Sequence, residues 1–291
     1  MYCDQRRICG AEGFEEEREL PALQAFIRRN FGKRKEVAFY GGSFTAMALE
    51  RQEELLRSVY KILDDCTDIR ISTHPAYLED ASLDLLDRYR VRTIELGIQD
   101  FCDRPLRKSG RNYSGEDALS ACRKIRAHGF VLGVQLIPGL PGADEVTLAQ
   151  NMAIIREMKP DLLRLYPLVV IKGTPLEEIY HRGEYRPLSI PEAVSICADY
   201  AELCHPLNTR IIKYGLPSNL DPKEVVDGAF HPAFGEKVKQ EILIRKLKNE
   251  PDLLAGLNAK DIQLLRAHGC RYLTAPDTML AAQGSQTSRK T

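Results

Sequence analysis

The chain has 291 residues, of which 44% are hydrophobic and 28% charged, a composition typical of a globular protein. Its 41 basic residues balance 41 acidic ones, so the net charge gives no indication of a nucleic-acid partner. No run approaches the roughly 18 apolar residues of a membrane span, and the first residues lack the apolar core of a secretion signal. We therefore expect a cytoplasmic protein that does not enter a membrane.

Short apolar runs alternate with amphipathic segments along most of the chain. The expected strands, in chain order, are Val37–Tyr40, Ile69–Thr73, Thr93–Ile98, Val131–Ile137, Leu162–Val170 and Arg210–Tyr214. The expected helices between them are Leu20–Asn30, Ala48–Asp64, Leu78–Tyr89, Gly115–His128, Glu145–Met158 and Pro191–Leu203. Repeated strand–helix alternation predicts a parallel sheet with right-handed crossovers. The nearly continuous apolar strands indicate burial on both faces.

Glycine or polar residues follow several of the expected strands. These groups are Gly41-Gly42-Ser43, Thr73-His74-Pro75, Gly97-Ile98-Gln99 and Pro138–Gly142. In barrels built from strand–helix units, the chemistry takes place at the carboxyl ends of the strands. We therefore expect these groups to surround one mouth. Each is weak evidence alone, because a Gly-Gly pair is more often only a turn.

The pattern weakens after the last expected strand. Residues 217–235 are loop-rich, helices are expected at Glu236–Lys248 and Asn258–His268, and the tail Gln283–Thr291 is polar. We predict three parts. An α/β domain covers residues 1–216, a mostly helical extension covers residues 217–282, and residues 283–291 form a disordered tail.

Eight cysteines are present, and none of them form a C-x-x-C pair. Disulfides are not expected in a cytoplasmic protein. Cys122, Cys197 and Cys204 fall in helical patterns, where a free cysteine usually acts as a small buried hydrophobe. Cys3 is the exception, because of the residues that follow it.

Taken together and in order, the strand-end groups resemble those of radical S-adenosylmethionine enzymes. In that family a segment similar to Phe39–Thr45 contacts the methionyl amino group of the cofactor. The resemblance implies that Gly41, Gly42 and Ser43 bind S-adenosylmethionine.

Two further segments and one arginine complete the implied cofactor site. Glu95–Asp100 is similar to the segment whose glutamine, here Gln99, faces the ribose of the cofactor. Arg111 stands twelve residues after Gln99, where related enzymes carry an arginine that pairs with the cofactor carboxylate. Leu136–Gly142 resembles the turn that lies near the adenosine. The resemblance therefore implies cofactor contacts from this part of the chain, by Gln135 and Pro138.

Within this superfamily, the chain resembles the bacterial group related to the Elongator catalytic subunit. The segments that carry this likeness are Cys3–Arg7, Pro167–Thr174 and Phe230–Glu236. The likeness runs from about residue 3 to about residue 240. It implies an α/β fold, a partial (β/α)6-type TIM barrel that lacks its first strand and carries a small helical C-terminal extension.

The resemblance also implies the cofactors. Such enzymes hold a 4Fe–4S cluster with three thiolates of a C-x-x-x-C-x-x-C loop, and thiolates suit iron because they are soft anionic donors. Cys3 matches the third of these ligands, and the other two would precede Met1, so we expect an N-terminally truncated or miscalled start. The implied reaction generates a 5′-deoxyadenosyl radical with an electron from a donor such as a flavodoxin or ferredoxin. The implied substrate is an RNA base, with transfer RNA as a candidate partner.

Several alternatives stay open. One is a catalytically inactive barrel that keeps an adenosine or S-adenosylmethionine pocket, so whether the chain is an enzyme is uncertain. Another is an unrelated metal-free lyase, which would need Lys172 or Lys213 at the barrel mouth. His74 stands where the group often has arginine. Candidates for substrate contact are Arg164, Tyr166 and His231, although packing is an equally good explanation for Tyr166 and His231.

Overall fold

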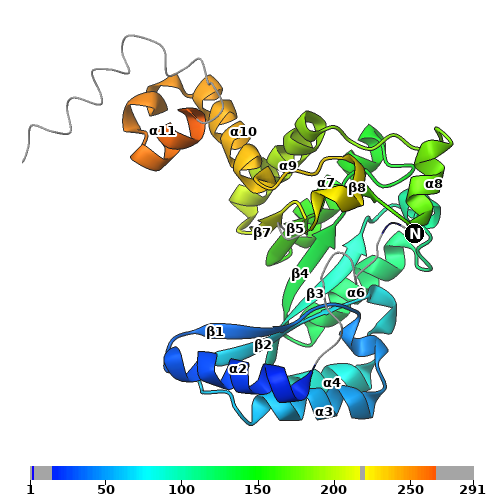
Figure 1. Cartoon of the computed structure of the whole chain (residues 1–291), viewed down its shortest axis with the longest axis vertical. Helices are drawn as coiled ribbons and strands as arrows, with labels where there is room; N and C mark the ends of the chain where they lie inside the picture. The colour runs from blue at the N-terminus through cyan, green and yellow to red at the C-terminus, as the bar shows by residue number, and fades with distance from the viewer. Residues whose placement is uncertain (1, 3–14, 217–219, 267–291) are drawn as a thin grey trace, which may run out of the picture.

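The computed structural model describes residue 2, residues 15–216 and residues 220–266. Its centre is a parallel six-stranded sheet that curves into an open half-barrel (Figure 1). In spatial order the strands are β1 (Lys35–Phe39), β2 (Thr67–Thr73), β3 (Val91–Gln99), β4 (Val131–Leu136), β5 (Leu162–Leu165) and β7 (Arg210–Tyr214). Each strand of this sheet pairs with the next strand of the same sheet along the chain, as successive strand–helix units require. The expected partial barrel is confirmed.

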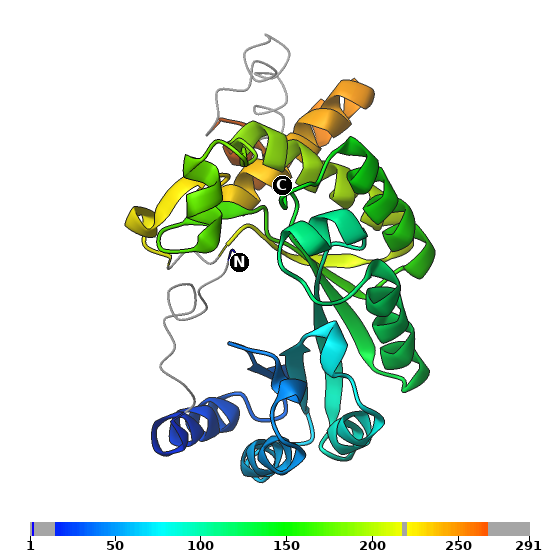
Figure 2. The same cartoon turned by 90° about the vertical axis from the view of Figure 1, so that its right-hand side faces the viewer.

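Helices cover the convex side of the sheet and leave the concave side open (Figure 2). They are α3 (Leu49–Tyr60), α4 (Asp80–Arg88), α6 (Gly115–Ala127), α7 (Glu145–Met158) and α9 (Ile190–Cys204). Three begin with reciprocal capping boxes, from Ser114, Asp144 and Ser189. Their apolar faces pack on the strands and bury residues such as Leu86 and Ile125 completely.

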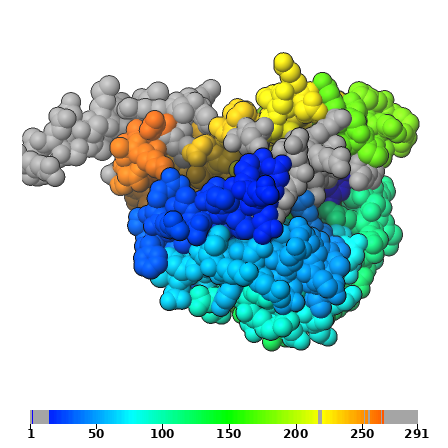
Figure 3. All heavy atoms as spheres, turned by 60° about the horizontal axis from the view of Figure 1, so that its bottom comes forward, coloured from blue at the N-terminus to red at the C-terminus, as the bar shows by residue number. Residues whose placement is uncertain are grey.

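Helix α2 (Glu16–Arg29) precedes the first strand and buries only Ile27. It forms an exposed ridge beside α3 (Figure 3), and the Ser58 hydroxyl donates to Glu16 Oε1 at 2.8 Å. The remaining short elements are α5 (Asp103–Lys108), α8 (Pro175–His181) and the 3-10 turns η1 (Phe44–Ala46), η2 (Pro75–Tyr77), η3 (His205–Leu207) and η4 (Pro222–Glu224). Helices α5 and α8 were not predicted, because six or seven residues are too few to show a helical period.

The prediction of one strand over Leu162–Val170 is wrong. The chain leaves the main sheet after β5, and β6 (Val169–Ile171) pairs antiparallel with β8 (Val225–Gly228) in a second sheet. Pro167 lies at the break, where it has no N–H to offer a ladder. The segment 217–235, predicted as loop, therefore contributes a strand.

Helix α10 (Phe234–Asn249) packs against α9 and is followed by η5 (Pro251–Gly256) and α11 (Ala259–Arg266). Arg245 of α10 donates through Nη1 to Asp199 at 2.6 Å and through Nη2 to the Ser195 hydroxyl at 2.8 Å. Phe234 and Val238 belong to the main hydrophobic core. Helical elements thus follow the barrel as expected, whereas the domain boundary at residue 216 stays a prediction, and the predicted tail lies outside the described residues.

Candidate functional site

A buried carboxylate, Glu95, stands at the centre of the concave face of the half-barrel. It projects from β3, and its side chain is 1% exposed. A Cβ on Gly133 of the neighbouring strand would lie 2.7 Å from Glu95 Cγ. The carboxylate therefore fits only because β4 has glycine at this point.

Glu95 accepts five hydrogen bonds, which come from the segment after β1 and from three strands. Oε1 accepts from Tyr40 Oη and Arg70 Nη1, both at 2.7 Å, and from Arg164 Nη2 at 3.0 Å. Oε2 accepts from Arg164 Nε at 2.5 Å and from Gln135 Nε2 at 3.0 Å. All the lone pairs of the carboxylate are thereby used.

The charges of this network balance. Arg70 pairs with Glu36 of β1 as well as with Glu95, and Thr93 donates to Glu36 Oε1 at 3.0 Å. Burial alone would raise the pKa of Glu95, but the hydrogen bonds from Arg164 and Arg70 hold it below its ordinary value. The carboxylate is therefore ionised at neutral pH.

Arg164 and Tyr40 form the accessible side of this network. The guanidinium of Arg164 lies over the Tyr40 ring, 5.2 Å from its centroid, and its Nη2 donates to Tyr40 Oη at 2.6 Å. Burial and the Glu95 carboxylate raise the pKa of Tyr40 to about 12. Burial opposes the charge of Arg164, but Glu95 more than offsets it, so the pKa of Arg164 is raised.

The predicted cofactor residues of the first strand end lie just beyond β1. Gly41 has φ +104°, a conformation that favours glycine, and a Cβ there would meet nothing within 4 Å. Gly42 is also exposed, and Ser43 is half-buried as it enters η1. The backbone is therefore open to close approach by a ligand at this point.

Gln99 ends β3, with φ +67° and its carbonyl accepting from Ile137 N at 2.8 Å. Its side chain folds back over Gly97, where a Cβ would lie 2.8 Å from Gln99 Nε2. Since β1, β2, β3 and β4 are parallel neighbours, Gln99 shares one edge of the sheet with Gly41 and with the turn that begins at Pro138. The expected mouth exists.

Arg111 reaches this mouth from the loop after α5. Its Nε and Nη2 donate to Tyr2 Oη at 3.0 and 2.6 Å, and its guanidinium lies 5.5 Å from the centre of the Tyr2 ring. Two residues on, Tyr113 donates to the carbonyl of Ile98 at 2.5 Å and so ties the loop to the end of β3. No acidic side chain in the described part of the chain pairs with Arg111.

Tyr2 and His74 complete the mouth, and sequence reasoning gave neither a defined role there. Tyr2 is buried against Leu140 of the Pro138–Gly142 turn and against β6. His74 lies edge-on to Tyr113, with ring centroids 4.8 Å apart. Burial and the nearby Arg111 cation lower the pKa of His74 to about 4, so the imidazole is neutral at neutral pH.

A cavity of about 530 Å³ adjoins the strand ends on the side of α7 and α9. It reaches Gln99, Pro138 and Gly139 and is floored by Asp100, whose Oδ1 accepts from Asn151 Nδ2 at 3.0 Å. Its size suits a small organic ligand. Gln99 and Pro138, predicted separately, thus border one cavity.

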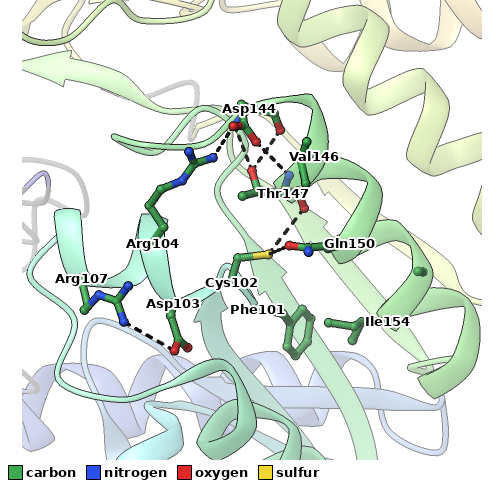
Figure 4. Close-up of a pocket in the computed structure, with 11 residues that line it drawn as sticks. Phe101, Cys102, Asp103, Arg104, Arg107, Asp144, Val146, Thr147, Gln150 and Ile154 are labelled. Carbon is green, nitrogen blue, oxygen red and sulfur yellow. Dashed lines mark hydrogen bonds and ion pairs between the residues drawn. The ribbon is translucent and has the colours of Figure 1, made fainter.

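A second hollow lies outside the barrel, between α5 and α7 (Figure 4). Its arginines are already engaged, Arg104 with Asp144 and Arg107 with Asp103. The Cys102 thiol points into it and lies 3.1 Å from Gln150 Oε1, and burial together with Asp100 raises the pKa of Cys102 to about 12. The thiol of Cys102 is protonated at neutral pH, and the charged side chains around it are paired with one another. We therefore assign no reaction to this hollow.

The remaining candidates are placed as follows. Tyr166 Oη accepts from Arg164 Nη1 at 3.3 Å on the inner face. His231 Nδ1 accepts from Ala233 N at 3.0 Å, in the turn before α10. Cys3, the predicted cluster ligand, lies outside the described residues. Within residue 2 and residues 15–216 and 220–266, no three His, Cys, Asp or Glu side chains converge as a metal site, and no helix is long and apolar enough to span a membrane.

Comparison with known protein families shows which superfamily the chain belongs to. The model described as the radical SAM superfamily matches residues 1–153, and that of the radical SAM C-terminal domain matches residues 160–243. The chain belongs to the radical SAM superfamily. The two matches meet near β5, so the half-barrel and the elements after it are both covered.

Curated relatives of this radical SAM chain include enzymes named for transfer RNA. It is 26% identical over 227 residues to a tRNA uridine(34) acetyltransferase of Methanocaldococcus jannaschii, covering 70% of this chain and 41% of the relative. It is 24% identical over 248 residues to human Elongator complex protein 3, covering 77% of this chain and 42% of the relative. The chain thus spans about four tenths of the length of these relatives.

Solved structures agree on the fold. The archaeal Methanocaldococcus infernus Elp3 with an N-terminal deletion superposes with a TM-score of 0.68 at 23% identity, covering 80% of this chain and 60% of that one. Coproporphyrinogen III oxidase of Escherichia coli, a radical SAM enzyme, gives a TM-score of 0.50 at 20% identity, covering 70% of this chain and 47% of that one. The half-barrel is therefore the fold of this superfamily.

Proposed function

We propose that this radical SAM chain binds S-adenosylmethionine across the mouth of the half-barrel and uses it, with a 4Fe–4S cluster, to modify an RNA base. The observation that carries the proposal is Arg111. It is a cation with no acidic partner among the described residues, held at the mouth by Tyr2. A ligand carboxylate would pair with this cation, and S-adenosylmethionine carries a carboxylate.

The other predicted residues suit the rest of the cofactor. The open backbone at Gly41 and Gly42, followed by Ser43, accommodates a close ligand such as the methionyl amino group. Gln99, held in place over Gly97, offers an amide to the ribose hydroxyls. Pro138 and the cavity beside it are of a size for an adenosine group. The same proposal gives Gln135, the residue before the register partner of Gln99 on β4, to the cofactor set.

With a 4Fe–4S cluster and S-adenosylmethionine bound, the site would supply a 5′-deoxyadenosyl radical for hydrogen abstraction from a substrate. Cys3 would provide one thiolate to the cluster, and the 291 residues contain no complete C-x-x-x-C-x-x-C loop. The reducing electron would come from a carrier such as a flavodoxin or ferredoxin in the cytoplasm. The protein's own residues bind and orient the cofactor, exclude water and hold the substrate.

RNA as substrate rests on the names of the relatives, which include tRNA uridine(34) acetyltransferases. Acetyl transfer is no part of the proposal. The polar inner face, with Tyr40 half exposed beside Arg164, gives a planar base both a ring to stack on and hydrogen-bonding groups.

The test compares S-adenosylmethionine binding by Arg111→Met and by the wild type, measured by equilibrium dialysis with labelled cofactor. Losing a charge-assisted pair should weaken binding roughly tenfold or more. Arg107→Met is the matched control, because that exposed arginine already has an acidic partner, Asp103. Equal binding by the two variants would refute the cofactor site.

A second measurement addresses catalysis. The chain and a version extended upstream from its own gene are reconstituted with iron and sulfide, reduced, and assayed for 5′-deoxyadenosine. Production by the extended form supports the radical reaction. Cofactor binding without any 5′-deoxyadenosine from either form would favour the alternative, a barrel that binds the cofactor without radical chemistry.

A further inference from the structure

Lys213 lies on the concave face of the half-barrel, beside Arg164. The two residues are register partners across β5 and β7, and paired residues of neighbouring strands point to the same side of a sheet. The register skips Ile212, so Ile211 and Tyr214 both pack into the core on the opposite side, under the helices. Since β7 is the last strand in the order of the sheet, Lys213 stands at the rim of the open side (Figure 2).

The positive charge of Lys213 has no acidic partner in the ranges that the structure describes. The residue is half-buried, and its side chain makes no hydrogen bond or ion pair there. By contrast, Lys35, another half-buried lysine, donates to Asp64 at 2.7 Å. Glu95 cannot serve Lys213, because it already accepts five hydrogen bonds. A partly buried charge without a counterion costs free energy that a bound anion would recover.

Arg164 supplies a second donor. Its Nε and Nη2 bind Glu95 and Tyr40, and Nη1 has a single partner among the described residues, Tyr166 Oη at 3.3 Å. A guanidinium has five N–H groups, so one on Nη1 remains. Like charges that face each other on neighbouring strands repel, and an anion bound by both replaces this repulsion with attraction.

The donors that remain suit phosphate better than carboxylate. A carboxylate pairs best with the two-pronged side of a guanidinium, and in Arg164 that side, Nε with Nη2, is taken by Glu95. What is left is one N–H of Arg164 and the three N–H groups of the Lys213 ammonium. The tetrahedral oxygens of a phosphate group can reach donors that point from two strands, and lysine binds phosphate as a compact point charge.

We propose that Lys213 and Arg164 form a subsite on the concave face that binds a phosphate group of the substrate. The subsite lies one residue before the end of β7, at the edge of the sheet opposite to β1 and the Gly41 turn. It positions the substrate by its charge and takes no part in a covalent step. The inference rests on the proposed function for the entry of a substrate into the lumen.

The test follows the melting temperature of the full 291-residue chain as anion is added at constant ionic strength. Inorganic phosphate represents a terminal phosphate and dimethyl phosphate a phosphodiester, so the two titrations distinguish the two sources of the group. At about ten times its dissociation constant, a bound phosphate should raise the melting temperature by roughly 3–5 °C. Acetate is the contrast. The proposal is overturned if neither phosphate compound raises the melting temperature more than acetate does.

Two variants of one position and one control locate the bound anion. Lys213→Met keeps the length of the side chain and should weaken phosphate binding roughly tenfold. Lys61→Met, the same change on an exposed residue at the end of α3, should bind phosphate as the wild type does. If Lys213→Met does not fold, Lys213→Gln removes the same charge and should show the same loss. A folded variant of position 213 that binds phosphate as tightly as Lys61→Met would refute the assignment.

Arg111 would also attract phosphate, because it too lacks an acidic partner among the described residues. The titrations are therefore repeated with Arg111→Met, in which Lys213→Met should still weaken phosphate binding roughly tenfold. If Arg111→Met alone abolishes the phosphate effect, the anion binds at the mouth and the inference is overturned. If Arg111→Met and Arg107→Met bind S-adenosylmethionine equally while Lys213→Met loses phosphate, the proposed function fails and the subsite stands.

Discussion

Replacing Glu95 by glutamine removes the one charge that holds the inner face together. The side chains of Glu95, Arg70 and Arg164 are 1%, 8% and 18% exposed, so two arginines would lose a partner that water cannot replace. Breaking a buried ion pair from one side costs about 3–5 kcal/mol. Arg70 keeps Glu36, and glutamine keeps one acceptor oxygen, so we expect about 3 kcal/mol.

Urea denaturation followed by circular dichroism measures this loss. With a slope of about 3 kcal/mol per molar, the midpoint should fall by about 1 M without a change in slope. Glu36→Gln is the matched control, because Glu36 pairs with the same Arg70 but its side chain is 36% exposed. Its loss should be below about 1 kcal/mol. Equal losses for the two variants would refute the reasoning, because burial would then not govern the cost.

The same variant has a defined pH dependence. The pKa of Glu95 is lower in the folded protein than its ordinary value of 4.5, so its contribution is complete above pH 4.5 and is lost as pH falls through the folded pKa. The stability gap between the wild type and Glu95→Gln should therefore be constant near neutral pH and should narrow below pH 4.5. A gap that widens on acidification would contradict the assigned direction of the shift.

Three further outcomes follow from the same contacts. Gly133→Ala should destabilise the fold by about 1–3 kcal/mol, because its Cβ would meet Glu95, whereas Gly256→Ala, with no neighbour within 4 Å, should change little in thermal melts. Arg111→Met should raise the pKa of His74 from about 4, though not fully to 6.5 because burial remains; a proton NMR titration in which it stays unchanged would contradict the proximity of the two groups. In native protein, iodoacetamide should spare the buried thiols whose pKa burial raises, and mass spectrometry should find labelling only after unfolding at Cys122, Cys197 and Cys204.

The sequence predicted the sheet because its strands are short, apolar and separated by clear helix signals. Five of the six strands of the main sheet coincide with expected runs to within a few residues, and β5 occupies only the first part of its expected run. The break between β5 and β6 was missed, because Leu162–Val170 reads as one apolar run unless Pro167 is treated as a terminator. The second sheet pairs residues more than fifty positions apart, a partnership that local periodicity cannot reveal.

The candidate site was predicted at its rim and missed at its centre. Gly41 and Gln99 lie at one edge because parallel strands end together. The Glu95 network could not be predicted from the sequence, because the strand register decides which charged residues lie side by side. One signal was available: Thr93, Glu95 and Gly97 alternate along β3 and so share a face with Gln99.

The contact between Tyr2 and Arg111 joins residues 109 positions apart. Its loss exposes one phenol ring, worth about 2 kcal/mol, and releases the hydrogen bonds that a cation donates to one oxygen, worth about 1.5–3 kcal/mol. That sum, about 4–5 kcal/mol, lies at or below the lower end of the roughly 5–15 kcal/mol that separates a typical folded domain from its unfolded state. Tyr2 should therefore detach many times for each global unfolding event, as a local opening with its own exchange rate. The mouth of the barrel should therefore open locally more often than the sheet beneath it unfolds.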